Sequence, residues 1–185
     1  MAFTDFCEGA LPVIVICHSQ IKRWKELCKE YNFLLPHQIV EGGATRFHSV
    51  KNALSAIPDD EKGLVAVHDA VRPLVSRQTI VNCFNGATKY GCAVPAIPVV
   101  DTVREVYDLN NNRMLNRASL RLIQTPQVFD VKLLKKAYNQ EYTETFTDCA
   151  SVFESAGNKI YLTEGNVENM KITTAHDLIL AQALL

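Results

Sequence analysis

The segment VHDAVRP, residues 67–73, joins an apolar run to a group of ionisable side chains. Leu64–Val67 reads as a buried strand, and His68, Asp69 and Arg72 follow it closely. An aspartate can hold a sugar hydroxyl or a metal ion, and an arginine suits bidentate contact with phosphate. His68 itself reads as a packed or exposed neighbour rather than as a base. The segment therefore either caps a helix or forms the floor of an active site.

A second candidate segment is EGGATRFHSV, residues 41–50. Gly42 and Gly43 follow a short strand, and a helix is expected to begin near Thr45. Glycine lets a backbone approach a flat ligand closely, and a helix N-terminus favours anions or acceptor groups. Because ordinary turns also use glycine pairs, the segment by itself leaves a binding loop and a plain turn both open.

Cations and hydroxyls recur farther along the chain, at Thr102, Arg117, Arg121, Thr125, Thr147 and Lys171. Thr147 or Asp148 could instead cap a helix, and Lys171 could lie on a solvated strand edge rather than neutralise a phosphate. No Ser-His-Asp order can be argued from these pieces. An inventory rich in cations and poor in nucleophiles favours phosphoryl or nucleotidyl transfer, in which the protein mainly positions groups and neutralises charge.

The elements that must position these residues alternate between strands and helices. Strands are predicted at 11–17, 37–42, 63–69, 92–100, 159–165 and 170–173, and helices at 19–31, 46–57, 76–90, 131–141, 147–157 and 175–185. Two prolines in 92–100 predict an edge strand or a bend there. The Asn-rich stretch TVREVYDLNNNRML predicts a projecting β-hairpin within an arm at about 101–125.

This alternation predicts an α/β fold, a Rossmann-like, doubly wound and mostly parallel sheet from which the β-hairpin arm projects. A length of 185 residues suits a single domain, 1–185. Ligands of such sheets bind beyond the carboxyl ends of the strands. Asp69, Arg72 and the glycine pair lie at such ends, and Lys171 lies near another. Their placement favours the active-site interpretation over simple capping.

Composition narrows the possible partners. A formal net charge of −1 argues against nucleic acid as a partner. No apolar run reaches the roughly 18 residues of a membrane span, and MAFTDFCEG has no signal-peptide pattern. The cysteines are scattered without a C-x-x-C pair, which predicts free thiols in a reducing cytoplasm rather than a disulfide or zinc role.

Six of the motifs together resemble one family. GGATRFHSVKNAL, VHDAVRP, PVVDTVREV, QTPQVF, TDCASVFESAG and EGNVENMKITTAHDL occur in the order and spacing of 2-C-methyl-D-erythritol 4-phosphate cytidylyltransferases. The resemblance runs from about residue 10 to the end of the chain. It implies a cytidylyltransferase of non-mevalonate isoprenoid biosynthesis that joins CTP to methylerythritol phosphate, with Mg²⁺ carried on the CTP, and releases pyrophosphate. It leaves the protein ligands of the metal unknown and places Asp69 in the metal's surroundings.

The resemblance assigns the nucleotide base to the glycine loop. Gly43, Ala44 and Ser49 would line the cytosine pocket, and Arg46 would support the loop. Thr147 would add a hydroxyl contact.

The resemblance assigns the sugar and phosphate chemistry to the residues around VHDAVRP. Asp69 would hold the ribose and the methylerythritol, and Ala70 and Arg72 would border the sugar phosphate. Thr125 would add a hydroxyl contact. Lys171 would contact the α-phosphate, where negative charge builds during in-line attack, so Lys171 and Asp69 are the expected catalytic residues.

The arm is expected to act between subunits. In the family the projecting hairpin embraces a second subunit of a homodimer. Thr102 and Arg117 lie in or beside this hairpin and would therefore bind the substrate phosphate in the partner's site.

The chain departs from the family pattern at its beginning. Family members start with a strand and a glycine-rich loop that carries Arg and Lys, and nothing in this sequence matches that loop. The domain is therefore expected to be N-terminally incomplete, and the 185-residue chain to be weakly active or inactive. Two alternatives stay open: a ribitol 5-phosphate cytidylyltransferase, and a non-catalytic nucleotide-binding paralogue.

Overall fold

The structure is a computed structural model that describes residues 11–185. The chain folds into two compact units. Unit 1 holds the described residues up to Val67 together with Phe129–Ile160, and unit 2 holds His68–Val128 together with Tyr161–Leu185. The expectation of a single domain stays a prediction.

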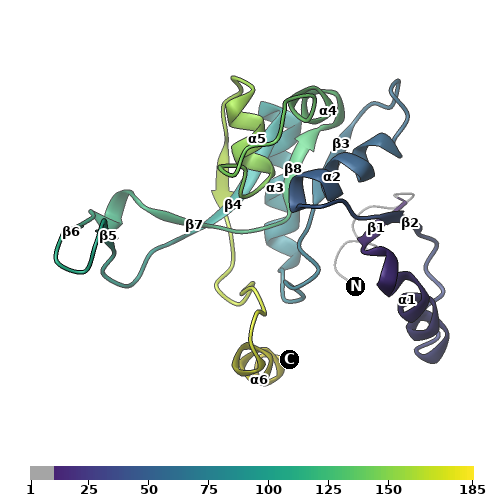
Figure 1. The fold of residues 1–185 in the computed structure, drawn as a ribbon, viewed down its shortest axis with the longest axis horizontal. Coiled ribbons are helices and arrows are strands. Elements are labelled where there is room, and N and C mark those ends of the chain that lie inside the picture. Colours follow the sequence, from purple (N-terminus) through teal and green to yellow (C-terminus); the bar gives the residue numbers. More distant parts are fainter. Residues whose placement is uncertain (1–10) are drawn as a thin grey trace. The chain divides into compact units, whose positions relative to one another are not determined.

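Unit 1 alternates strands and helices, as the sequence predicts (Figure 1). Its elements are β1 Val13–Ile16, α1 His18–Glu30, β2 Gln38–Glu41, α2 Arg46–Ser55, β3 Leu64–Val67, α4 Val131–Ala137 and α5 Cys149–Ser155. Strands β1 and β2 are parallel, with a register that runs from Val13 opposite Gln38 to Ile16 opposite Glu41. They form a two-stranded sheet of their own. The glycine loop follows directly from the end of β2.

Unit 2 is built on one long strand and the helix before it. Its elements are α3 Arg77–Tyr90, β4 Cys92–Pro98, β5 Arg104–Val106, β6 Asn112–Met114, the short 3₁₀ helix η1 Arg117–Ser119, β7 Arg121–Ile123, β9 Leu162–Glu164 and α6 Ala175–Ala183. Strand β8, Gln127–Asp130, passes from unit 2 into unit 1. Within unit 2, both β7 and β9 pair with β4.

Parallel and antiparallel pairs both occur in unit 2. Strand β9 runs parallel to β4, whereas β7 runs antiparallel to it. The predicted hairpin is confirmed: β5 and β6 pair antiparallel, and Figure 1 shows them beyond β7, away from β4. The α/β class with a projecting hairpin is therefore confirmed.

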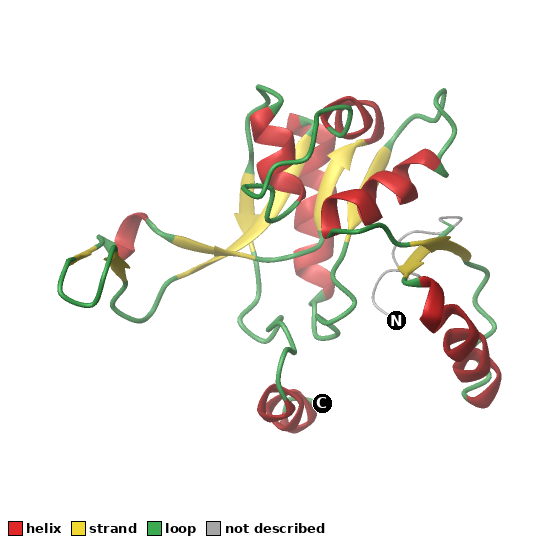
Figure 2. Cartoon of the chain, in the orientation of Figure 1, coloured by secondary structure: helices red, strands yellow, loops and turns green. Residues whose placement is uncertain are grey.

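Two sequence expectations about strands fail in part or in full. Within unit 2, β4 is not an edge strand, because β7 and β9 both pair with it, while the bend that was the other alternative stays a prediction. The β7 register begins at Ala96, directly after Pro95, and the Gln124 N–H donates to the Pro95 carbonyl at 2.8 Å. The predicted strand 170–173 is a loop, and Figure 2 shows loop from the end of β9 to α6.

Several helices begin or end at residues whose side chain or backbone conformation caps the helix. The Ser76 side chain accepts the Thr79 N–H at the start of α3, and Gly91 ends that helix in a left-handed conformation with φ of 80°. At the start of α5 the cap is Asp148, which forms a capping box with Ser151. Thr147, the other candidate cap, lies outside the helix.

Each unit has its own apolar core. In unit 1 the buried side chains include Phe47, Leu54, Phe129, Leu134, Val152 and Phe153, and in unit 2 they include Val75, Ile80, Cys83, Ala93 and Val94. Helix α6 differs, since Ala181 is its buried residue while Leu178, Ile179 and Leu180 are exposed. Cys17, Cys28, Cys83 and Cys149 are free cysteines, as predicted, and Cys7 lies outside the described residues.

We predict that Gly86→Ala destabilises the protein although alanine favours helices. A Cβ at Gly86 would lie 2.8 Å from the Cβ of Ala93 and 3.0 Å from the Tyr161 ring. Relieving this overlap is expected to lower the free energy of unfolding by about 1–3 kcal/mol, measured by urea denaturation. Asn85→Ala, on the exposed neighbouring position of α3, is the control and should be neutral or slightly stabilising. A Gly86→Ala variant as stable as the wild type would contradict this packing.

Candidate functional site

Asp69 begins a tight turn directly after β3. The Arg72 N–H donates to the Asp69 carbonyl at 3.0 Å and closes the turn. Arg72 Nε lies 3.7 Å from Asp69 Oδ2, and Lys171 Nζ lies 3.6 Å from the same oxygen. The structure therefore gathers the predicted Asp69, Arg72 and Lys171 around one carboxylate. We call these three residues the charged cluster.

The charged cluster is only partly open to solvent. The side chains of Asp69 and Arg72 are 17% and 13% exposed, whereas that of Lys171 is 49% exposed. The Ile172 N–H donates to the Val71 carbonyl at 2.8 Å, which fixes the Lys171 segment beside the turn without a strand. Lys171 therefore offers a cation that can contact a ligand while its backbone stays anchored.

Four residues close a ring of hydrogen bonds around this cluster. The Arg72 guanidinium donates to the Asn169 carbonyl at 2.7 Å, and the Asn169 side-chain amide donates to the Thr125 carbonyl at 2.8 Å. The Thr125 hydroxyl lies 3.1 Å from His68 Nδ1, and His68 Nε2 lies 3.0 Å from the Arg72 carbonyl. The Thr125 hydroxyl also accepts the Asp69 N–H at 3.0 Å, so the ring is tied to the turn.

Burial shifts two pKa values in this ring. It lowers the pKa of the His68 imidazole, while the hydrogen bond to the Arg72 carbonyl and the charge of Asp69 oppose the shift. Burial also lowers the pKa of the Arg72 guanidinium, and Asp69 opposes this shift as well. An arginine nevertheless stays charged at physiological pH, so the cluster keeps its cations while His68 is favoured in its neutral form.

Sequence reasoning missed a set of buried amides that supports the cluster. Asn166 accepts the Ser76 N–H at 3.1 Å and donates to the Leu74 carbonyl at 3.1 Å. Gln124 donates to the Asn166 carbonyl at 2.9 Å, and Asn169 is fully buried. Both asparagines stand in the motif EGNVENMKITTAHDL just before Lys171. Their polarity beside an apolar stretch was the available signal, but only the fold shows that Asn169 is buried and Asn166 half-buried.

The glycine loop in unit 1 is shaped by its own side chains. A Cβ at Gly43 would lie 2.4 Å from the Cβ of His48, so glycine is required for packing on α2. The Gly43 N–H donates to the Ser49 hydroxyl at 3.1 Å, and this hydroxyl donates to the Thr45 carbonyl at 2.9 Å. The structure thus brings Gly43 together with Ser49 of α2, and the exposed Ala44 lies between Gly43 and the start of that helix.

Arg46 connects two helix starts within unit 1. Its guanidinium donates to the Cys149 thiol at 3.3 Å, and the Tyr138 hydroxyl donates to the same sulfur at 3.2 Å. Burial raises the pKa of both Cys149 and Tyr138, which keeps thiol and phenol neutral. The first turn of α2 is thereby held at the first turn of α5, next to the exposed Thr147.

The remaining predicted residues lie at the surface of unit 2. Ala70 is exposed within the Asp69 turn. Thr102 and Arg117 are exposed at the base of the hairpin, where the Arg117 guanidinium donates to the Val100 carbonyl. No hydrogen bond or ion pair described for residues 11–185 joins these two to the charged cluster.

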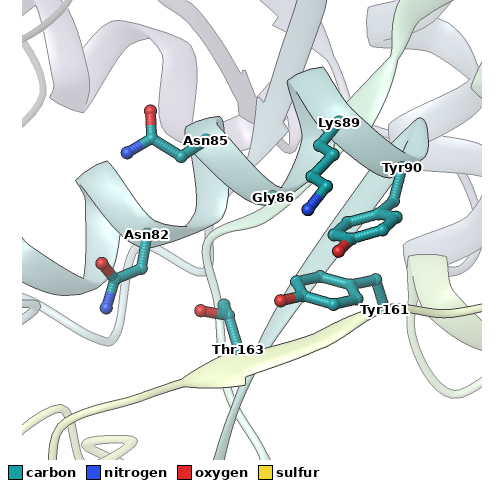
Figure 3. A pocket seen from close by; sticks show the side chains of 7 residues that line it. All are labelled: Asn82, Asn85, Gly86, Lys89, Tyr90, Tyr161 and Thr163. Atoms are coloured by element: carbon teal, nitrogen blue, oxygen red, sulfur yellow. The ribbon is translucent and has the colours of Figure 1, made fainter.

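A hollow in unit 2 lies elsewhere, between α3 and β9. Figure 3 shows its lining, with Tyr90 and Tyr161 lying against each other and Lys89 beside them. The two rings are stacked at 4.1 Å, and Lys89 Nζ lies 5.0 Å from the centre of the Tyr90 ring. The hollow contains none of the predicted site residues, and its one cation already faces a ring. We do not assign it a ligand.

Within residues 11–185 no group of three or more His, Cys, Asp and Glu side chains is placed to hold a metal ion. Over the same residues no helix has both the length and the apolar character that crossing a membrane requires.

An α/β fold with cations and hydroxyls gathered beyond its strands is typical of proteins that handle phosphate esters. Residues 7–185 match the family model of 2-C-methyl-D-erythritol 4-phosphate cytidylyltransferase, IspD. The chain belongs to this family of nucleotidyltransferases.

Individual relatives agree with this assignment. The cytidylyltransferase of Phocaeicola vulgatus is 47% identical over 184 residues, and that of Bacteroides fragilis is also 47% identical over 184 residues; each match covers 100% of this chain and 83% of the relative. The crystal structure of 2-C-methyl-D-erythritol 4-phosphate cytidylyltransferase from Thermus thermophilus matches with a TM-score of 0.79 and 32% identity. That match covers 99% of this chain and 84% of the other.

We predict that Asn169→Asp destabilises unit 2 more than an ordinary surface substitution. The change replaces the donor that faces the Thr125 carbonyl with an acceptor and places a carboxylate at a fully buried position. Leaving a buried acceptor unsatisfied costs about 1–3 kcal/mol, and urea denaturation measures the loss. The control is Asn85→Asp, the same change at an exposed position of α3. Equal stability of the two variants would refute the role given to the Asn169 amide.

Proposed function

We propose that the protein transfers CMP from CTP to 2-C-methyl-D-erythritol 4-phosphate and releases pyrophosphate. Membership of the family supports the reaction, and the placement of two cations beside one carboxylate supports the assignment of the site. A phosphate oxygen of the sugar phosphate attacks the α-phosphorus of CTP. The new P–O bond forms as the bond from the α-phosphorus to the bridging oxygen breaks, and pyrophosphate leaves.

The charged cluster would act on the reacting groups. Lys171 Nζ, half exposed, would contact the α-phosphate as its negative charge grows. Asp69 would hold the ribose and the methylerythritol, and Ala70 and Arg72 would border the sugar phosphate. Thr125 is 4% exposed and its hydroxyl already bonds to the turn, so its hydroxyl contact with substrate stays a prediction.

The glycine loop of unit 1 would bind the base. Gly43, Ala44 and Ser49 would contact cytosine, and Arg46 would hold the loop through Cys149. Thr147, exposed next to α5, would add a hydroxyl contact.

Mg²⁺ would enter with CTP rather than through a protein site. The described residues offer no acidic or imidazole cluster, and the Asp69 carboxylate is already faced by two cations. Bound to the triphosphate, the ion would supply neutralisation of its negative charge.

The first test is pyrophosphate release by the protein with CTP and Mg²⁺, comparing methylerythritol 4-phosphate with ribitol 5-phosphate. Release with the first substrate only is expected. Release with ribitol 5-phosphate alone would replace the proposal by the alternative substrate. CTP binding without release, in a chain that also carries the family's N-terminal strand and glycine-rich loop, would favour a non-catalytic protein. The rate of pyrophosphate release in the same assay also shows whether the 185-residue chain is weakly active or inactive, as expected.

Lys171→Gln is expected to lower kcat by about 10²–10³-fold, the usual loss when one charge-stabilising donor is removed. The KM for CTP should change much less, because the charge of the α-phosphate grows mainly in the transition state. Steady-state pyrophosphate release measures both. Lys132→Gln, at an exposed position of α4, serves as the control. A kcat for Lys171→Gln close to that of the control would remove Lys171 from the catalytic role.

We also propose that the protein is a cytoplasmic homodimer in which the hairpin arm completes the partner's site. Thr102 and Arg117 would then bind the sugar phosphate in trans. Exposed apolar side chains on the arm, Val106, Tyr107, Leu109 and Met114, support an interface there.

Mixing two inactive variants tests this arrangement. Arg117→Gln and Lys171→Gln should each be impaired alone, and a mixture exchanged into heterodimers should recover part of the wild-type rate. Recovery occurs only when one site receives its Arg117 and its Lys171 from different subunits. No recovery, with heterodimers verified by native mass spectrometry, would place both residues in one subunit's site.

A further inference from the structure

For a neutral His68, the hydrogen bonds to the Arg72 carbonyl and to the Thr125 hydroxyl have one consistent direction. The Arg72 carbonyl can only accept, so His68 Nε2, at 3.0 Å, carries the proton. In the neutral ring Nδ1 is then an acceptor, and the Thr125 hydroxyl, at 3.1 Å, donates to it. The lone pairs of the same hydroxyl accept the Asp69 N–H at 3.0 Å. Both ends of the Asp69–Arg72 turn are thus bound through one imidazole.

We propose that neutral His68, with its proton on Nε2, is the positioning residue of the charged cluster, holding the turn that presents Asp69 to Lys171. This inference rests on the proposed nucleotidyl transfer. His68 does not face a substrate in this role. It acts on Asp69 through Thr125, and on Arg72 by binding the Arg72 carbonyl.

Another protonation state would change the bond to Thr125. A proton on Nδ1 would point at the Thr125 oxygen, which would then accept from His68 as well as from the Asp69 N–H and would no longer donate to the ring. The charged groups that act on the ring are Asp69 and Arg72, the Thr125 backbone also bonds to it, and Lys171 Nζ lies 3.6 Å from the Asp69 carboxylate. Burial lowers the pKa of His68, so the neutral form persists when the pH falls below the ordinary value of 6.5.

Nitrogen NMR of histidine-labelled protein tests the tautomer without any activity. His68→Gln assigns the resonances by their loss. The expected result is a neutral imidazole with its proton on Nε2, whose half-protonation falls at a pH below the ordinary value of 6.5. A proton on Nδ1, or half-protonation at pH 6.5, would overturn the proposal.

Two substitutions test the two ring nitrogens of His68 one at a time. His68→Gln can keep the donor to the Arg72 carbonyl but loses the acceptor for the Thr125 hydroxyl. His68→Asn can keep this acceptor but loses the donor. Each is expected to lower kcat by on the order of 10²-fold, the usual effect of a small misplacement of reacting groups. The exposed His176 supplies the control, His176→Gln, which should behave as the wild type.

The Asp69 amide gives a second readout that is independent of turnover. Its hydrogen exchange should accelerate in His68→Gln, in which the Thr125 hydroxyl loses its acceptor, and less in His68→Asn. Wild-type kinetics and unchanged exchange in both variants would overturn the proposal. If a wild-type chain that also carries the family's N-terminal strand and glycine-rich loop shows no transfer, the proposed function fails, and the tautomer and the exchange data still decide whether His68 holds the turn.

Discussion

The ring of hydrogen bonds through His68, Arg72, Asn169 and Thr125 is the constraint on which the candidate site depends. Without it, the turn after β3 would be an exposed loop whose carboxylate and guanidinium have no defined direction. With it, the Asp69 carboxylate lies between two cations, one largely buried and one half exposed. A site that only positions groups and neutralises charge needs such preorganisation more than it needs a nucleophile. The buried amides of Gln124 and Asn169 therefore matter for the site as much as the charges do, because they hold the charged residues in position.

Each unit holds one candidate site loop in place, and the contacts that hold it differ between the two units. In unit 2, buried side-chain amides fix an irregular loop, because no strand runs through 170–173 to provide backbone pairing. In unit 1, the glycine loop is fixed by the close approach of His48, by Ser49 and by the contact of Arg46 with Cys149. Each loop follows a strand and is completed by a segment distant in sequence. Substitutions in these supporting residues are expected to act on function through position rather than through contact.

The sequence predicted most of the elements and the residues of the charged cluster, because apolar periodicity and cap residues are local properties. It also predicted the hairpin, since alternation around an Asn-rich turn is local as well. It failed where distant segments decide the outcome. Within unit 2, strand β4 holds Pro95 inside a sheet because β7 and β9 both pair with it, which no local pattern records. The hydrogen bonds that give Asn166, Asn169 and His68 their roles reach partners 42–97 residues away, apart from the His68 bond to Arg72. Such partners become visible only in the fold.

The most direct test of the central claim is a crystal structure of the protein with CTP and Mg²⁺ bound. The account predicts that Lys171 Nζ contacts an oxygen of the α-phosphate and that the Asp69 carboxylate accepts a hydrogen bond from a ribose hydroxyl, with the four-residue ring still closed. A nucleotide bound away from both residues, or a ring opened by the nucleotide, would contradict the account.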